Sequence, residues 1–437
     1  MNPVTPIPVP ASSDAYCGLA LVLLLLAPLA IAGLALVNTG LGRSRSAAQA
    51  ILGSLAVISV AVIAFALFGA AIAGSLPGTA GGAGHAFQLA GHLWNWIGSG
   101  SFLLSGFSSA PVPAELALLF EMAGVAFAAI IPWGSGADRW RLAAGCAATA
   151  LIAGIVCPLM MHWVWGGGWL AALGPDFSLG AGFLDPGGAA TVHVVGGLSA
   201  LALIWLLGPR AGKYPRTGIS TAVPGHNAVY VLFGSLLGLV GWLAWNAAGA
   251  ILWMNAPLAA LPVVAVNTVL SAAAALGATL AVTRYRFGKP DASLCANGWL
   301  AGLVTSSACA AVATPVESIF AGLVAGVITP LLVELLELAI SIDDPSGAIA
   351  AHAAAGLWGL LALAFFAPKP GQLIAQLVGI ATLLGIVLPL VYLLFAVLNR
   401  FVPFRVDPDG ERMGMDLHEL GGGAYPEFVI HRDESYR

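Results

Sequence analysis

Charged residues are scarce in this sequence. Only 8 % of its 437 residues are Asp, Glu, Lys or Arg, and 59 % are hydrophobic, whereas a soluble globular domain carries roughly 25 % charged residues. A net charge of −4 is weak and indicates neither nucleic-acid binding nor a strongly basic lipid-binding surface. The composition therefore excludes a soluble protein and predicts an integral protein of the lipid bilayer.

Cysteine motifs and a basic leader are also lacking. The five cysteines are scattered, and none has the CxxC or Cys/His spacing of a disulfide or metal site. We therefore expect no metal and no cofactor. Residues 1–13 contain no Lys or Arg, although a secretory signal needs positive charge before its apolar core. We expect the first apolar segment to be retained as a transmembrane helix.

Long apolar runs are the main feature that is present. Runs of about 20 apolar residues are typical of transmembrane helices rather than barrel strands. Residues 75–111 are rich in Gly, Ser and aromatic residues and are predicted to form a long loop outside the membrane. We predict an all-α membrane protein with eleven spans, at residues 14–37, 47–73, 112–134, 141–164, 188–208, 226–249, 258–283, 292–312, 316–339, 347–367 and 373–398.

The distribution of basic residues predicts the orientation. Lys and Arg collect in loops on the cytoplasmic side of a membrane. Of the 16 Lys and Arg residues, all except Lys369 fall on one side of the predicted spans. In a protein of the cytoplasmic membrane, this bias places the N-terminus on the outer side and the C-terminus in the cytoplasm. The loop after the ninth span departs from the bias because it is acidic, with Glu334, Glu337, Asp343 and Asp344.

Two segments repeat one pattern. Residues 185–193 and 344–352 both begin with Asp-Pro and end in histidine. They open the fifth and tenth spans, and an odd step of five spans inverts the second copy in the membrane. We therefore predict an extracytoplasmic segment at 1–13, five-helix repeats at 14–208 and 226–367, an eleventh helix at 373–398 and a cytoplasmic tail at 399–437.

The repeated pattern places two histidines at one depth. Asp344 is interpreted as a helix cap, since Asp before Pro is typical of a helix start. His193 and His352 each lie eight residues beyond their Asp, or about 12 Å along a helix. Half of the bilayer core is about 15 Å thick, so both imidazoles should meet near the midplane. Neutral imidazole has one donor and one acceptor nitrogen, so such a pair can relay a proton.

Other interpretations of the histidines remain open. An ionisable residue inside a membrane is by default a functional candidate, but two satisfied core histidines would also fit the pattern. Ligation of a haem by both histidines is a third interpretation, which would make the protein a membrane cytochrome.

The chain resembles the ammonium transporter family (Amt/Mep/Rh superfamily) from about residue 14 to Tyr425. The resemblance rests on ordered segments at 162–168, 184–193, 241–247, 343–352 and 414–419. It implies a homotrimer that binds ammonium, takes up nitrogen and contacts a PII-type regulatory protein. It also implies that His193 and His352 line a pore, that Trp165, Phe120 and Asp185 recruit ammonium, and that Phe120 and Trp245 form a gate.

Three positions depart from the family pattern. Trp245 stands where the family usually has a phenylalanine, and Gly249 stands where many members have a serine that helps to hold ammonium. Glu121 follows Phe120 where glutamine is common. Loss of the serine hydroxyl removes one hydrogen bond, worth roughly 0.5–1.5 kcal/mol. On a helix Glu121 points about 100° away from Phe120, which favours a structural role over a vestibule charge.

The resulting hypothesis is a transporter, not an enzyme: ammonium is recruited, loses its proton, and crosses as ammonia between the histidines. An ammonium sensor with little conduction and a channel for neutral ammonia or gas are the alternatives. Tail residues Gly414, Asp416, His418 and Tyr425 match the family's regulatory segment, and a tail that only packs on the cytoplasmic face is equally open.

Overall fold

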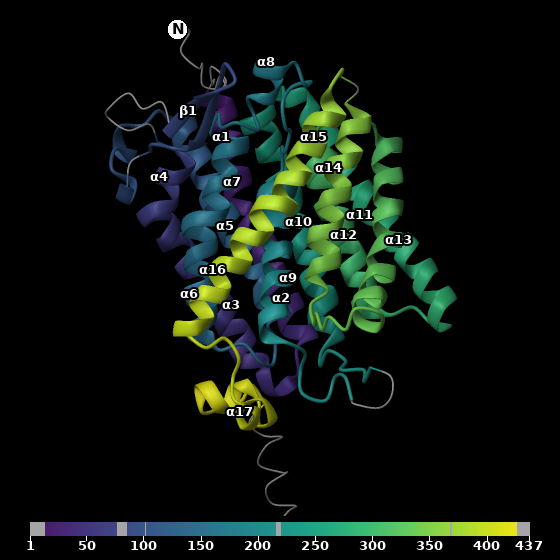
Figure 1. Ribbon diagram of the computed structural model, residues 1–437. Helices are drawn as coiled ribbons and strands as arrows, with labels where there is room; N and C mark the ends of the chain where they lie inside the picture. The colour runs from purple at the N-terminus through teal and green to yellow at the C-terminus, as the bar shows by residue number, and fades with distance from the viewer. Residues whose placement is uncertain (1–13, 77–84, 101, 216–219, 368, 426–437) are drawn as a thin grey trace, which may run out of the picture.

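The computed structural model describes residues 14–76, 85–100, 102–215, 220–367 and 369–425. The predicted segment 1–13 lies outside the described residues. The described chain is a helical bundle (Figure 1), and ten of its helices are long and apolar enough to cross a membrane. Most spans therefore agree with the predicted pattern, while the count of ten is one short of the predicted eleven.

Several membrane-spanning helices in the first half of the bundle are divided into two or three consecutive helical elements. Pro28 begins the second part of the first span, and because it has no N–H to donate, the helical hydrogen-bond ladder is interrupted between α1 and α2. The elements are α1 (Asp14–Leu26), α2 (Pro28–Leu41), η1 (Ser44–Ser46), α3 (Ala47–Ala64), η2 (Phe65–Gly69), α4 (Ala70–Ala73), α5 (Val112–Ser135), α6 (Leu142–Leu151), η5 (Ile152–Val156), α7 (Cys157–Val164), α8 (Leu173–Phe177), η6 (Ala189–Val194) and α9 (Val195–Leu207).

Side-chain caps mark several helix starts in the second half. The side chain of Asn227 accepts from Tyr230 N, and Thr314 forms a capping box with Glu317. The elements are α10 (Ala228–Met254), η7 (Leu258–Ala260), α11 (Leu261–Phe287), α12 (Ala292–Cys309), α13 (Pro315–Leu338), η8 (Ile349–Ala354), α14 (Ala355–Phe366), α15 (Gln372–Thr382), η9 (Leu383–Val387), α16 (Leu388–Phe401), α17 (Pro408–Met413) and η10 (Asp416–Leu420).

Helix α12 accounts for the difference between ten and eleven. It has 18 residues and packs against α11, α13 and α14, but it is not among the ten apolar helices. Asn297, Thr305, Ser306 and Ser307 are all buried on it. These polar side chains lower its mean hydropathy, and because they are buried they face neighbouring helices rather than lipid.

The predicted loop 75–111 has structure of its own. It contains a two-stranded antiparallel hairpin of β1 (His85–Leu89) and β2 (His92–Ile97), followed by η3 (Phe102–Leu104) and η4 (Phe107–Ser109). Ala90 and Gly91 both have positive φ, as tight two-residue hairpin turns require. We call this end of the bundle the hairpin end, and the opposite end, which carries α17, the tail end (Figure 1).

The two repeated segments enter the bundle from opposite ends. Asp185 lies beside Trp165 at the hairpin end, and Asp344 lies beside Ser135 at the tail end. Both histidine-bearing stretches, η6 and η8, are π-helical, a local form that is frequent at functional sites. The helices cross closely at Gly197, where a Cβ would lie 2.5 Å from Ala353 N.

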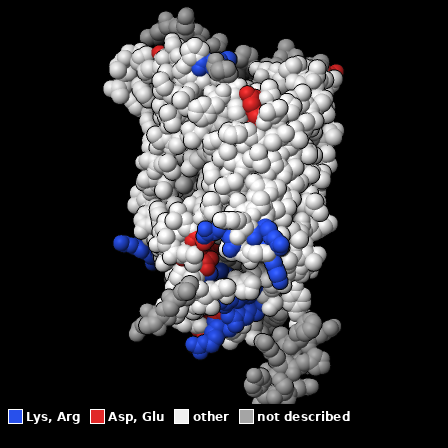
Figure 2. Space-filling model, turned by 90° about the vertical axis from the view of Figure 1, so that its right-hand side faces the viewer, with Lys and Arg blue, Asp and Glu red and all other residues white. Residues whose placement is uncertain are grey.

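Charges gather toward the tail end, where most of the blue side chains in Figure 2 lie, while the middle of that face is white. Acidic residues at the end of α13 and in the loop after it form ion pairs there with basic residues. Lys213 Nζ lies 2.6 Å from Glu337, and Arg210 lies 2.8 Å from Asp343. Burial alone would raise the pKa of Asp343, but hydrogen bonds and charge from Arg210 outweigh it and lower that pKa to about 2.

Candidate functional site

The two predicted pore histidines meet in the centre of the bundle. His193 Nδ1 and His352 Nδ1 are 3.4 Å apart, and both side chains are buried. Trp242 stacks on the His193 ring at 5.1 Å, and Phe127 meets it edge-on at 4.8 Å. Because each neutral ring can donate from one nitrogen and accept at the other, this contact can pass a proton between the two halves.

The histidine geometry does not suit a haem between the two rings. An iron bound by two nitrogens on opposite sides, at about 2 Å each, would hold those nitrogens about 4 Å apart. The Nδ1 atoms are 3.4 Å apart, and Trp242 and Phe127 fill the space beside His193 that a porphyrin would need. The contact therefore favours a direct histidine pair.

A stack of aromatic rings contains the predicted gate and recruitment residues. Phe120 and Trp245 are stacked with ring centroids 3.9 Å apart. Trp165 meets Phe120 edge-on at 5.4 Å. Phe127 lies between this stack and the histidines, 5.8 Å from Trp245 and 4.8 Å from His193. The rings thus form a continuous apolar column from the hairpin end to the histidine pair.

The loop of residues 185–187 holds two of these rings in place. Trp165 Nε1 donates to the carbonyl of Asp185 at 2.9 Å, and Trp245 Nε1 donates to the carbonyl of Gly187 at 2.7 Å. Between them, the carbonyl oxygen of Pro186 lies 2.2 Å from the position of a Cβ on Gly249. Glycine at 249 is therefore required by this close approach, and the Pro186 backbone occupies the space of the absent serine side chain.

A second glycine makes room for the larger gate ring. A Cβ on Gly124 would lie 3.3 Å from Trp245 Cη2 and 3.1 Å from Met161 Cε. Gly124 lies one helical turn beyond Phe120 on α5, on the same face. The tryptophan at 245 is thus matched by a small residue opposite it.

Sequence reasoning missed Gly124, Phe127, Trp242 and Trp253. Trp253 stacks on Trp165 at 4.9 Å with an interplanar angle of 3°. The signal was present as helical periodicity, because Trp245, Gly249 and Trp253 are spaced i, i+4, i+8 on α10 and share one face.

The two repeated aspartates both cap their helices, but they differ in how many of their carboxylate oxygens accept hydrogen bonds. Asp344 Oδ2 accepts from Ile349 N at 2.8 Å, and its Oδ1 accepts from the hydroxyls of Ser135 and Ser346. Asp185 Oδ2 accepts from the backbone and hydroxyl of Thr191. Among the described residues, Asp185 Oδ1 has no hydrogen-bond partner.

Glu121 lies outside the aromatic column. Its side chain is buried, and its Oε2 has no hydrogen-bond partner among the described residues. The structural pairing expected for Glu121 is thus incomplete at Oε2.

The predicted tail residues lie against the tail end of the bundle. Asp416 accepts from the backbone N–H groups of Ala48 and Gln49, at the start of α3. The Tyr425 hydroxyl lies 3.1 Å from His226 Nε2. Gly414 has φ 101°, and His418 lies 3.6 Å from Asp407. The tail therefore closes over the ends of several helices.

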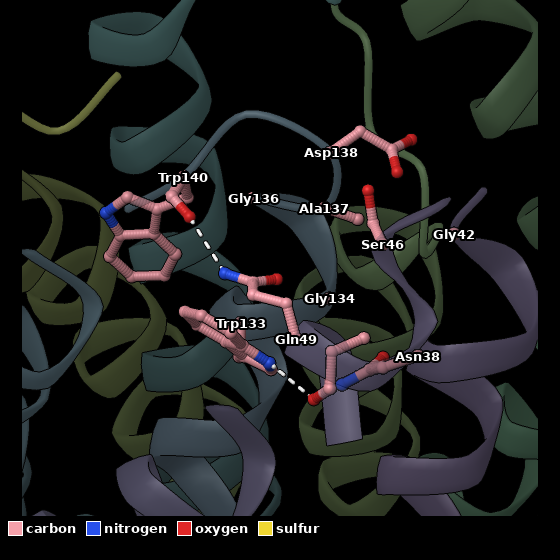
Figure 3. Close-up of a pocket in the computed structure, with 11 residues that line it drawn as sticks. Asn38, Gly42, Ser46, Gln49, Trp133, Gly134, Gly136, Ala137, Asp138 and Trp140 are labelled. Carbon is pink, nitrogen blue, oxygen red and sulfur yellow. Dashed lines mark hydrogen bonds between the residues drawn. The ribbon is translucent and has the colours of Figure 1, made fainter. Parts of the chain in front are cut away.

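A small pocket lies next to this tail contact (Figure 3). Gln49 and Trp133 line it; Gln49 Nε2 donates to the carbonyl of Trp140, and Trp133 Nε1 donates to that of Ala50. None of the predicted site residues is among the described residues that line it. The pocket belongs to the packing of α2, α3 and α5 and lies apart from the histidine column.

This arrangement defines a membrane transport protein, with a helical bundle built around a buried histidine pair under a column of aromatic rings. The sequence model of the Ammonium Transporter Family matches residues 18–425. The ammonium transporter Amt2 of Archaeoglobus fulgidus is 32 % identical, over 92 % of this chain and 86 % of that protein. The ammonium transporter of Bacillus subtilis is 29 % identical, over 90 % and 94 %.

Solved structures agree with this similarity. A protein described as a sensor Amt protein superposes with a TM-score of 0.82 at 26 % identity, covering 92 % of this chain and 98 % of that one. The Rh50 protein of Nitrosomonas europaea shares the fold, with a TM-score of 0.71 and 97 % coverage of both chains. The chain belongs to the Ammonium Transporter Family, a family of multi-pass membrane transporters and not of enzymes, and its function is ammonium transport.

Proposed function

We propose that transport proceeds by recruitment of ammonium at the aromatic column, loss of its proton, and passage of ammonia between His193 and His352. The contact between the two histidine rings carries this proposal. A bare cation in the apolar column would be costly, so deprotonation before the gate lowers the barrier. Neutral ammonia then passes the stacked Phe120 and Trp245, while the histidine pair offers a route for the proton.

Recruitment is proposed to use the rings and backbone at the hairpin end. The indole face of Trp165 attracts a cation through its π electrons, and Phe120 packs edge-on against it. The negative charge of Asp185 adds to this attraction, and its Oδ1 has no hydrogen-bond partner in the described chain. The Pro186 carbonyl beside Gly249 stands where a serine hydroxyl would stand in other members.

The proposed topology has eleven spans, of which α12 is the eighth. The protein lies in the cytoplasmic membrane, with the hairpin end outside the cell and the tail end in the cytoplasm. The opposite entry of the Asp185 and Asp344 helices supports inverted repeats at 14–208 and 226–367, followed by the helix at 373–398. The basic side chains at the tail end support its cytoplasmic location. Labelling of single cysteines placed in the β1–β2 turn and in the tail, from each side of intact cells, tests this orientation.

The expected partners are two further copies of the chain and, at the tail end, a PII-type regulator. The exposed apolar faces of α1 and α10, including Leu25 and Phe233, support packing against lipid or neighbouring copies. Mass measurement of the detergent-solubilised protein tests the trimer, and co-purification with and without residues 414–425 tests the regulator.

Ammonium-pulse currents in proteoliposomes test the central mechanism. His193→Ala and His352→Ala should each change the current or its selectivity for ammonium over other cations. His162→Ala is the matched control, since this buried histidine bonds the Ala73 carbonyl and lies away from the pair. Currents that are identical in wild type and both pore variants would remove the histidine pair from the mechanism.

A further inference from the structure

One indole covers the cation-binding face of another at the hairpin end. Trp253 and Trp165 are parallel within 3°, with ring centroids 4.9 Å apart. A cation held between two parallel rings needs them about 7 Å apart, twice the heavy-atom contact distance of ~3.5 Å. Trp165 is only 6 % exposed, so its ring is almost completely closed to ammonium in this conformation. One of the two rings must move before a cation can bind.

The hydrogen bonds of the indole groups show which ring is free to move. Trp165 and Trp245 are each held by an N–H bond to a backbone carbonyl in the 185–187 loop. The Trp253 Nε1 is buried and has no partner among the described residues. Outward rotation of Trp253 breaks no side-chain hydrogen bond and exposes its N–H to water, which is favourable for a buried unpaired donor.

The backbone around Trp253 also permits this movement. Trp253 is in the last turn of α10, which ends at Met254, and Asn255 follows in the left-handed conformation. Trp253 is only partly buried, unlike Trp245 two helical turns earlier on the same face. Its side chain can therefore rotate at the helix end without disturbing the core of the helix.

We propose that Trp253 is a lid on the ammonium recruitment site, which opens by rotating away from Trp165 and exposing its π face to the incoming cation. This role rests on the proposed recruitment at Trp165. Phe120 meets both indoles edge-on, at 5.4 and 5.9 Å, so it remains as a wall of the site when Trp253 leaves. Trp253 thus sets the apparent affinity for ammonium through the free energy of lid opening.

Three variants in proteoliposomes test the lid. The measured quantity is the ammonium concentration that gives a half-maximal current. Trp253→Ala removes the covering ring and should lower this concentration about 3- to 10-fold, the scale of one lost aromatic stack. Trp253→Phe keeps a covering ring and should stay within about twofold of wild type, as one small ring contact at most is altered. Trp205→Ala, on the exposed face of α9, is the control and should leave the concentration unchanged.

An increase of the half-maximal concentration in Trp253→Ala would show that Trp253 is a wall of the binding site and would overturn the lid. An unchanged concentration would overturn it too. Trp253→Leu replaces the alanine variant if the latter does not elute as folded protein. If wild type shows no ammonium-dependent current or uptake, the transport proposal fails; equilibrium ammonium binding, followed by tryptophan fluorescence in wild type and Trp253→Ala, still decides the lid.

Discussion

Replacement of Trp245 by phenylalanine should speed ammonium transport if opening of the stacked rings limits the rate. The Trp245 ring is held by its N–H bond to Gly187 at 2.7 Å and by the stack on Phe120. Phenylalanine keeps a stacking ring but loses the hydrogen bond, which is worth about 0.5–1.5 kcal/mol. A barrier lowered by that amount corresponds to a rate increase of about 2- to 10-fold.

The assay is the initial rate of the ammonium-evoked current at saturating ammonium, per folded protein in the vesicle. Trp242→Phe is the matched control, because Trp242 also donates one indole hydrogen bond, to Ser307 Oγ, but stacks on His193 instead of Phe120. We expect no acceleration in that variant. A folded Trp245→Phe protein with an unchanged or slower rate would refute the idea that the tethered ring limits passage.

Three further predictions concern close packing, capping and charge. Gly249→Ser should lower thermal stability and should not restore recruitment, because its Cβ would lie 2.2 Å from the Pro186 carbonyl oxygen; an unfolding curve equal to wild type would contradict this. Asp416→Ala should lower the unfolding free energy by about 1 kcal/mol through loss of the cap on α3, measured by denaturant titration. The pKa of Asp343, about 2 beside Arg210, lies below its ordinary 3.8. Its ion pairs therefore stabilise the protein above about pH 4, and this contribution is lost as the pH falls through 2; Asp343→Asn should weaken that acid dependence of the melting temperature.

The histidine pair could be predicted from the sequence because its signal is regular. Each histidine lies eight residues beyond its aspartate, on helices that enter from opposite ends. The two imidazoles are therefore expected at the same depth in the membrane, independently of the conformation of the loops. The 3.4 Å contact between His193 and His352 agrees with that expectation. The π-helical form of both segments could not be predicted, since it depends on packing against the neighbouring helices and not on local sequence.

The aromatic column was predicted only in part. Phe120, Trp165 and Trp245 were found through a family pattern, whereas Trp253 and Gly124 required the structure. The face of α10 that carries Trp245, Gly249 and Trp253 was visible as helical spacing, but its partner on α5 was not, because facing helices are far apart in the sequence. The hairpin in 85–97 was also missed, since its turn is Ala90-Gly91 and not a strong hairpin dipeptide such as Asn-Gly.

The two halves of the protein share one capping design and differ in what they leave unsatisfied. At the tail end, both carboxylate oxygens of Asp344 are used, by Ser135, Ser346 and Ile349. At the hairpin end, Asp185 has one oxygen with no partner in the described chain, next to the carbonyl that holds Trp165. A carboxylate oxygen without a partner can accept a charge-assisted hydrogen bond, whereas the oxygens of Asp344 already have their donors. The two segments thus place their histidines alike and their aspartates differently, and this difference supports the proposed recruitment of ammonium at the hairpin end.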